Sequence, residues 1–461
     1  MRFDSWGRIR RQQRAHCEPA ALTAADAPPA GLLAFGNGRS YGDSCHNDAG
    51  RLMPMQPGAV IHHFDADTGI LEADAGVTLA AILAEVMPKG WFLAVTPGTA
   101  QATLGGAIAN DVHGKNHHRR GSFGHSVLAF DLMRSDQGRV SCSPSDNGAL
   151  FKASIGGMGL TGVIGRVRLQ LMRVPSANIR QRAWRFFSLD GYFDAIDAVD
   201  AEHEYSVAWI DQLATGGAAG RGVLMAGDHD AEGGAAAAPL PPRFSVPVQP
   251  PVNLLNRLTL RAFNALYFGR APKARTVTQI GWRSYFHPLD AIGNWNRLYG
   301  PRGLYQHQSV FPAETARQTT LELMACARAH GHASFLTVLK RFGERPQPGL
   351  LSFARPGFTL TLDFANRGGK TVAMLDALDG IVVAAGGAVN PYKDQRMSPD
   401  VFAASFPEWG ALEAMRDPKL MSDFWRRTAM QLPADGGQSF ANQETFQTGT
   451  DDNLKQMRQP A

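Results

Sequence analysis

Residues 95–126 read V-T-P-G-T-A-Q-A-T-L-G-G-A-I-A-N-D-V-H-G-K-N-H-H-R-R-G-S-F-G-H-S and fall into two unlike halves. The first half sets Gly98, Gly105 and Gly106 among small residues and hydroxyls, which leave little side-chain bulk to pack. Glycine lets the backbone pass close to another object and lets N–H groups approach an anion. The second half gathers donors and cations, namely His113, Lys115, Asn116, His117, His118, Arg119 and Arg120. We interpret the segment as a loop that wraps a cofactor and ends beside a reaction centre.

Two more glycine-rich segments, residues 36–42 and 156–162, lie in the same strand-rich amino-terminal block. One such segment alone is typical of a tight turn between strands. Three together predict one long ligand that lies across the block, with its diphosphate held by backbone N–H groups. A dinucleotide such as FAD has the required length.

The last of these segments matches a G-x-G-x-x-G pattern at Gly157, Gly159 and Gly162, but its context excludes a Rossmann domain. Residues 163–171 alternate like a strand, whereas the Rossmann fingerprint opens a helix. No acidic residue follows about 20 positions later to bind a ribose. NAD bound through a Rossmann domain is therefore rejected.

Composition is that of an ordinary globular chain with a substantial core. The 461 residues are 44% hydrophobic and 19% charged, with a net charge of +5. The basic residues form no continuous stripe, which disfavours nucleic acid as a partner. The mild basic excess favours anionic small molecules or an anionic membrane surface.

Neither zinc nor disulfide bonds are indicated. The four cysteines are far apart and form no CxxC pair. His113 and His117 have the i, i+4 spacing of a zinc pair, but Gly114 and the loop-like surroundings argue against a helix there. We expect no metal.

The amino-terminus carries no secretory signal. Arg10 and Arg11 form a twin-arginine pair, but no apolar stretch follows them, and no apolar run in the chain is long enough to span a bilayer. We expect a cytoplasmic protein with peripheral contact at the inner membrane.

From about residue 178 the pattern changes to alternating helices and antiparallel strands, which predicts an α+β domain with a broad sheet. Residues 214–252 are rich in Ala, Gly and Pro and predict a mobile insertion, and the polar tail 436–461 predicts disorder. Strands are expected at residues 276–288, 304–312, 334–341 and 357–364, and helices at residues 314–330 and 370–385.

Residues 253–268 have helical apolar spacing with Arg257 and Arg261 interspersed. Two interpretations remain open for this amphipathic, basic segment. It is either a helix packed on the core or an element that faces a membrane or lipid.

Eight motifs carry a resemblance to known proteins: G-R-S-Y-G-D (38–43), P-G-T-x-Q-x-T-L-G-G-A-I-A (97–109), D-V-H-G-K-N-H-H (111–118), G-S-F-G (121–124), G-G-M-G-L-T-G (156–162), F-H-P-L-D (286–290), W-N-R-L-Y-G-P (295–301) and Y-K-D (392–394). Through them the chain resembles the vanillyl-alcohol-oxidase/PCMH flavoprotein superfamily and, within it, closely resembles the decaprenylphosphoryl-β-D-ribose 2′-oxidase family. The resemblance covers roughly residues 30–430, and H-G-K-N-H-H is its most specific motif.

The resemblance implies an α+β fold with a two-part PCMH-type FAD-binding domain and a substrate-binding cap domain with a broad antiparallel sheet. The FAD-binding domain is expected at residues 1–177 and the cap at 178–387, with a return to the FAD domain at 388–435. Arg39 stands where many superfamily members attach flavin through a histidine, so the FAD is expected to be non-covalent. Thr361 stands where the family has a cysteine beside the flavin, which removes a nucleophile but leaves hydride chemistry plausible.

The implied activity is oxidation of the C2 hydroxyl of a polyprenyl-phosphoryl pentose to a keto sugar, with hydride transfer to flavin N5. A partner reductase of the short-chain-dehydrogenase type would complete the epimerisation, which leads to an arabinan precursor of cell wall polysaccharide. The alternatives are a soluble sugar, aldonolactone or alditol oxidase of the same superfamily, and a flavin-bearing subunit that only relays electrons or scaffolds a membrane complex.

The resemblance also assigns roles to residues. The expected catalytic residues are Lys393, His113 and Tyr41. The expected cofactor-binding residues are Gly36, Asn37, Gly38, Arg39, Ser40, Tyr41, Pro97, Gly98, Thr99, Thr103, Gly105, Gly106, Ala109, Asn110, His113, Gly114, Asn116, His117, Gly121, Ser122, Gly157, Gly162, Ile164 and Lys393. The expected substrate-binding residues are Lys115, Trp209, Gln306, Gln308, Lys340, Thr361 and Lys393.

Simpler interpretations stand beside these. Lys393 can merely pair with Asp363 or Asp394, and Tyr41 and Trp209 can be plain core aromatics. Gln306 and Gln308 alternate along a strand and therefore face the same side, which fits either a polar cavity or an exposed sheet face.

Overall fold

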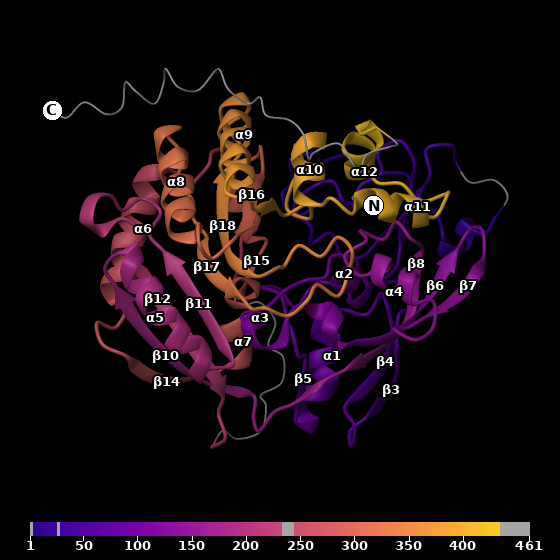
Figure 1. Ribbon diagram of the computed structural model, residues 1–461, viewed down its shortest axis with the longest axis horizontal. Helices are drawn as coiled ribbons and strands as arrows, with labels where there is room; N and C mark the ends of the chain where they lie inside the picture. The colour runs from indigo at the N-terminus through magenta and orange to yellow at the C-terminus, as the bar shows by residue number, and fades with distance from the viewer. Residues whose placement is uncertain (1–2, 25–27, 233–243, 434–461) are drawn as a thin grey trace.

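The structure is a computed structural model that describes residues 3–24, 28–232 and 244–433. Two antiparallel sheets stand side by side, one of five strands and one of eight, and helices pack against each of them (Figure 1). The fold is therefore α+β, as predicted. The tail predicted to be disordered lies outside the described residues.

The five-stranded sheet has the order β3-β4-β8-β6-β7. Its strands are β3 (Ile61–Asp65), β4 (Ile70–Asp74), β8 (Val163–Gln170), β6 (Val127–Arg134) and β7 (Gly138–Cys142). The helices packed with it are α1 (Leu79–Val86), α2 (Leu104–Ala109) and α4 (Gly148–Ser154). In α1 the Thr78 hydroxyl caps the helix by accepting from the Ala81 N–H. The buried residues of α1 recur at i, i+3, i+4 and i+7, so one face of the helix is buried in this core.

The eight-stranded sheet has the order β14-β10-β12-β11-β17-β18-β16-β19. Its strands are β14 (Thr276–Gly281), β10 (Asn178–Phe186), β12 (Gly222–His229), β11 (Tyr205–Ile210), β17 (Thr337–Phe342), β18 (Gly357–Ala365), β16 (Leu304–Phe311) and β19 (Ala388–Val389). One face of this sheet packs against α5 (Leu189–Glu202), α8 (Ala316–Ala329) and α9 (Gly369–Ala384).

Side chains alternate between the two faces of these strands. On β11, Ala208 and Ile210 belong to the core beneath the helices, whereas Val207 and Trp209 line a cavity on the other face. On β16, Gln306 and Gln308 face the cavity, and His307 contacts Asp379 of α9 instead. Every second residue of these strands therefore faces the cavity, and the residues between them face the helices.

The last described segment returns to the beginning of the chain. The parallel pair β1 (Leu32–Phe35) and β2 (Arg51–Pro54) lies beside it, because Leu32 N–H donates to Lys419 O and Met421 N–H donates to Leu32 O. Figure 1 shows α10 (Pro399–Ser405), α11 (Trp409–Met415) and α12 (Asp423–Arg427) in yellow next to the indigo amino-terminal segments. Residues 390–394 thereby reach the glycine-rich loop 36–42.

Two expectations for the cap need correction. Residues 222–229 fall in the predicted mobile insertion, yet they form β12 between β10 and β11, with Val223, Leu224 and Ala226 buried. Glycine and alanine fit there because their small side chains suit a tightly packed strand. The strand expected at residues 276–288 ends at Gly281, and α7 (Trp282–Phe286) follows it.

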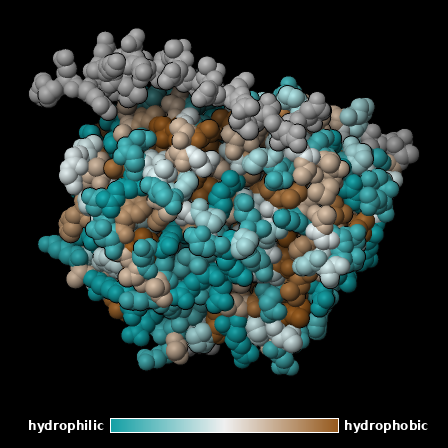
Figure 2. All heavy atoms as spheres, in the orientation of Figure 1, coloured by the Kyte–Doolittle hydropathy of each residue, from teal (hydrophilic) through white to brown (hydrophobic). Residues whose placement is uncertain are grey.

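The helix expected at residues 253–268 is α6 (Arg257–Arg270), which begins after the Asn256 cap. No helix within the described ranges is long and apolar enough to cross a membrane. Figure 2 shows the front of the molecule covered mainly by hydrophilic residues, with hydrophobic residues in small groups among them.

Candidate active site

A cavity of about 750 Å³ lies between the glycine-rich loops of the amino-terminal part and the open face of the eight-stranded sheet. Parts of all three glycine-rich segments line it, together with Gln306, Gln308, Lys340, Thr361 and Lys393 from the other side. Segments far apart in the sequence therefore meet at one site, as the sequence predicts.

The glycine-rich half of the cavity fits a dinucleotide. The backbone N–H groups of Asn37, Gly38, Arg39 and Ser40 make no hydrogen bond with any described residue, and all four residues line the cavity. Successive unpaired N–H groups form a concavity suited to a diphosphate. The buried Nε of Arg39 also has no partner within the described ranges, which adds a cationic donor to the same wall.

Glycine at two other positions keeps the cavity open. Gly98 and Gly159 line it, and no atom lies within 4 Å of the place where a Cβ would stand on either residue. Any side chain there would occupy space that a ligand can use. The wall therefore meets both needs of FAD, anion-binding N–H groups and close approach to the backbone.

Lys393 is brought to Tyr41 by a close contact between two loops. Tyr41 N–H donates to Tyr392 O at 3.1 Å, and Lys393 Nζ lies 4.4 Å from the centre of the Tyr41 ring. A Cβ on Gly42 would stand 1.4 Å from Asp394 O, so only glycine permits this approach. The pair that the resemblance implies is thus formed by main-chain packing.

Asp363 lies behind this pair and is completely buried. Its Oδ1 accepts a 2.6 Å hydrogen bond from Gln306 Nε2. Burial raises the pKa of Asp363 to about 7, although Gln306 and Lys393 oppose the rise. Burial lowers the pKa of Lys393 to about 8, and the charge of Asp363 opposes that fall. Lys393 can therefore gain or lose a proton near neutral pH.

His113 lies between Gln308 and Lys340. Gln308 Nε2 is 2.8 Å from His113 Nε2, and Lys340 Nζ is 3.2 Å from His113 Nδ1. Burial and the nearby lysine hold the pKa of His113 well below its usual value, so the imidazole is neutral. When Gln308 donates to Nε2, the proton of the ring resides on Nδ1, and Lys340 must then be neutral to accept it at Nζ, because a charged ammonium only donates.

Two further lysines reach the cavity with depressed pKa values. Burial lowers the pKa of Lys115 to about 7, and its Nζ donates to Tyr285 O at 2.5 Å. Burial, with Lys115 and Lys393 nearby, lowers the pKa of Lys340 to about 7 as well. Three half-buried lysines therefore reach this cavity with lowered pKa values, and an anion placed beside them would favour their charged forms.

The rest of the sheet wall combines polar and apolar side chains. Thr361 is buried and pairs across the sheet with Gln308 and Val338. Trp209 packs edge-on against Tyr267 of α6, with ring centres 4.7 Å apart. No thiol stands at position 361, and burial raises the pKa of Cys45, the cysteine in the cavity wall, to about 12. Thiolate chemistry is therefore not favoured in this wall.

Of the residues expected to bind cofactor, five lie outside the cavity wall: Asn116, His117, Gly121, Ser122 and Gly157. Their cofactor-binding role stays a prediction, and the contacts that three of them make support the loops. Asn116 donates to Ala94 O and Glu204 Oε1, and His117 Nδ1 accepts from the Gly343 N–H. A Cβ on Gly157 would stand 2.2 Å from Ala153 O, so this glycine serves packing. The remaining expected site residues all line the cavity.

Sequence reasoning treated Asp363 only as a pairing partner and missed Asn390. Asn390 Nδ2 donates to Gln308 Oε1 at 2.9 Å and fixes the orientation of that amide. Asp363 stands two residues after Thr361 on β18, and the period of two was the signal that could have placed both on one face. Asn390 lies in an irregular turn, where no pattern marks its direction.

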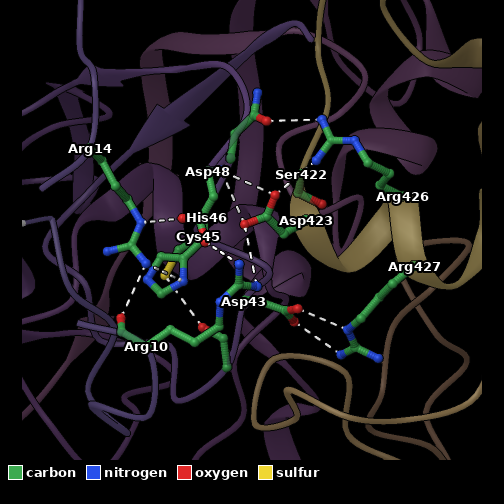
Figure 3. A network of polar contacts seen from close by, with 12 residues as sticks. Arg10, Arg14, Asp43, Cys45, His46, Asp48, Ser422, Asp423, Arg426 and Arg427 are labelled. Atoms are coloured by element: carbon green, nitrogen blue, oxygen red, sulfur yellow. Dashed lines mark hydrogen bonds and ion pairs between the residues drawn. The ribbon is translucent and has the colours of Figure 1, made fainter. Parts of the chain in front are cut away.

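Arg427 of α12 holds the two loops of the Lys393–Tyr41 contact together, and Figure 3 shows its contact with Asp43. Its Nε and Nη2 donate to Asp43 at 2.8 and 3.0 Å, and Nη2 also donates to Asp394 Oδ2 at 2.8 Å. Asp43 and Asp394 directly follow the segments that carry Tyr41 and Lys393. The forked guanidinium suits such a bridge because it can bind two carboxylates at once.

Comparison with known proteins agrees with the site. A family model described as an FAD binding domain matches residues 19–143. The chain is similar to decaprenylphosphoryl-beta-D-ribose oxidase of Mycolicibacterium smegmatis, with 32% identity over 431 residues, 88% of this chain and 91% of the relative. It is 34% identical over 378 residues to an uncharacterized protein in the mprA 5′ region of Streptomyces coelicolor, 77% of this chain and 100% of the relative. Delta(24)-sterol reductase of Homo sapiens is 29% identical over 108 residues, 23% of this chain and 21% of that protein.

Proposed function

Since this chain belongs to the decaprenylphosphoryl-β-D-ribose oxidase family and is an FAD-dependent oxidoreductase, we propose that it oxidises the C2 hydroxyl of a polyprenyl-phosphoryl pentose to a ketone. The observation that carries the proposal is one cavity that three half-buried lysines and the glycine-rich loops line together. The lysines suit an anionic substrate, and the loops suit the cofactor.

The residues of this wall divide the work of an alcohol oxidation. When bound, FAD would take up the hydride, with its two electrons, that leaves the carbinol carbon. Lys393 in its neutral form accepts the hydroxyl proton at Nζ, and its pKa of about 8 keeps part of the population neutral. Asp363 and Gln306 lie behind Lys393. The charge of Asp363 raises the pKa of Lys393, and Gln306 donates a hydrogen bond to Asp363 Oδ1. Gln308 and Lys340 contact the two ring nitrogens of the neutral His113 and thereby fix the orientation of this ring in the cavity wall.

Lys115 and Lys340 provide the anchor for a phosphate. An anion placed beside them favours their charged forms, because it offsets the desolvation that lowers each pKa to about 7. Binding of the substrate is therefore coupled to proton uptake by these side chains.

Apolar residues on the same wall favour a lipid-linked substrate over a free sugar. Val207, Trp209, Leu336 and Val338 line the cavity beside Phe263 and Tyr267 of α6. A free sugar, lactone or alditol makes no use of this surface, whereas a prenyl chain buries it.

The test is anaerobic reduction of the bound flavin by a panel of alcohols. The loss of visible flavin absorption measures the reduction. We expect lipid-linked ribose phosphate to bleach the flavin, and free ribose, aldonolactones and alditols at equal concentration to leave it oxidised. Bleaching by free sugars alone would indicate that the chain is a soluble sugar oxidase. Bleaching by no alcohol would favour a subunit that relays electrons.

We also propose a partner enzyme, because the ketone must be reduced again at C2 to give an epimerised sugar. A reductase of the short-chain-dehydrogenase type supplies that chemistry. Incubation of the chain, substrate and such a reductase with its nicotinamide cofactor should yield the C2 epimer, and omission of either protein should yield none. The cytoplasmic location stays a prediction of the sequence.

A further inference from the structure

Helix α6 is exposed on most of its circumference. Only Leu260, Asn264 and Phe268 are buried along Arg257–Arg270, and they form a single stripe at i, i+4 and i+8. Leu260 and Phe268 are the apolar members of that stripe, and Phe268 packs against Trp209 and Val223. The helix is therefore attached to the sheet by a narrow contact.

The side of α6 opposite the buried stripe is apolar, which is unusual for a surface helix. At about 100° per residue, Leu258, Ala262, Leu266 and Gly269 fall on the outermost side, together with Thr259, whose hydroxyl donates to Leu254 O. Leu258 is 78% exposed and Leu266 is 53% exposed, and Leu254 before the helix is 44% exposed. We call Leu254, Leu258, Ala262, Leu266 and Gly269 the α6 surface.

Three arginines lie on α6. Arg270 lies beside the α6 surface, whereas Arg257 and Arg261 lie nearer the buried stripe. All three are exposed, and their side chains form no hydrogen bond or ion pair with any residue in the described ranges. The same helix contains no acidic residue. An exposed apolar side on a helix that carries arginines and no acidic residue is the pattern of a helix that lies in a membrane interface.

The basic excess of the whole protein is concentrated around this helix. Residues 233–289 contain seven Lys and Arg residues and no Asp or Glu. The other 404 residues carry 39 basic and 41 acidic residues, so they contribute no positive excess. A region with this excess of positive charge is attracted to an anionic surface.

The α6 surface adjoins the cavity. Phe263 and Tyr267 are stacked with their ring centres 5.9 Å apart, and both line the cavity while remaining more than a third exposed. Phe263 also contacts Phe335 on the cavity wall. A path of aromatic side chains thus connects the helix to the site where the sugar is oxidised.

We propose that the α6 surface docks on an anionic phospholipid bilayer, with Leu258 and Leu266 inserted among the headgroups and the arginines in contact with anionic lipids. The proposal deepens the proposed function, since a lipid-linked substrate would then enter from the membrane past Phe263 and Tyr267. Vesicles without any sugar substrate test it, so its failure and the failure of the oxidase proposal are separate results.

The experiment is flotation of the full chain with its FAD on vesicles of phosphatidylcholine with and without phosphatidylglycerol. We expect binding to the anionic vesicles, weak binding to pure phosphatidylcholine, and release by high salt. The double variant Leu258→Asp/Leu266→Asp should lose more than about tenfold in partitioning, because two exposed apolar anchors are replaced by anions. Replacement of Arg257, Arg261 and Arg270 by Gln should cost about fivefold for each arginine.

The matched control is Val60→Asp/Met430→Asp, which introduces two anions at residues 49% and 45% exposed outside the α6 surface. This control should float as the unaltered chain does, and the flavin spectrum should show that all variants are folded. Failure of the unaltered chain to bind anionic vesicles would overturn the proposal. So would equal binding by Leu258→Asp/Leu266→Asp, or a concentration-dependent dimer that this variant abolishes while vesicles remain unbound.

Discussion

The chemistry of the site depends on a few ionisable side chains whose pKa values lie near neutral pH. Burial raises the pKa of Asp363 to about 7 and lowers the pKa of Lys393 to about 8. The charge of each group partly offsets the effect of burial on the other. A group with a pKa near the working pH is an effective proton acceptor. Their position beside Tyr41 makes this pair the centre of the proposed mechanism.

Replacement of Lys393 by Met removes the proton acceptor and keeps a similar side-chain length. We expect the rate of flavin reduction by substrate to fall by about 10²- to 10⁴-fold, the usual contribution of a general base. Stopped-flow absorbance measures the rate, and the FAD content of the purified variant serves as the control. Full turnover with normal FAD content would remove Lys393 from the mechanism.

Asp363→Asn keeps the contact with Gln306 but removes the negative charge. Lys393 must be neutral to accept a proton, so the rate should rise with pH through the pKa of Lys393, about 8. The charge of Asp363 raises that pKa. The variant should therefore reach its full rate at a lower pH than the unaltered chain. An unchanged pH–rate profile, or a shift to higher pH, would show that Asp363 does not act on Lys393.

At the scale of the elements, the site is formed where the carboxy-terminal segment returns to the first glycine-rich loop. The contact depends on the missing side chain of Gly42 and on the Arg427 bridge from α12. Asp43 and Asp394 are almost completely buried, so loss of the arginine would leave two carboxylates without their cation.

Arg427→Met should lower the free energy of unfolding by roughly 3 kcal/mol, because it breaks a buried ion pair and leaves the carboxylates of Asp43 and Asp394 without their cation. Urea unfolding of the FAD-loaded chain measures the change. The control is Arg139→Met, whose arginine is 65% exposed in its pair with Asp131 and should cost less than about 1 kcal/mol. Equal effects of the two substitutions would mean that the bridge does not stabilise the site.

Gly42→Ala places a methyl group 1.4 Å from Asp394 O and should push the Lys393 loop away from Tyr41. We expect slower flavin reduction and a weaker hold on FAD, measured by the flavin retained after extended dialysis. Gly217→Ala is the matched control, because no atom lies within 4 Å of its added Cβ. If both variants retained flavin and rate equally, the close approach of the loops would not matter for function.

For the whole molecule, the three glycine-rich segments and the period of two in the cap strands predict the two halves of the cavity. Gln306 and Gln308 lie on one sheet face because side chains alternate along β16, and the register of β16 and β17 with β18 places Lys340 on the same face. Local patterns missed β12, whose Gly- and Ala-rich sequence is that of a loop unless neighbouring strands enclose it. They also missed Asn390, since its direction is fixed by contacts with distant segments.

The claim on which the account depends is that the glycine-lined half of the cavity holds one FAD without a covalent bond. The visible absorption spectrum of the purified chain, taken before and after acid precipitation, tests it most directly. We predict about one FAD per chain in the native protein and complete release of the flavin into the supernatant. A colourless chain that cannot be reconstituted with FAD, or flavin that stays with the precipitate, would contradict it.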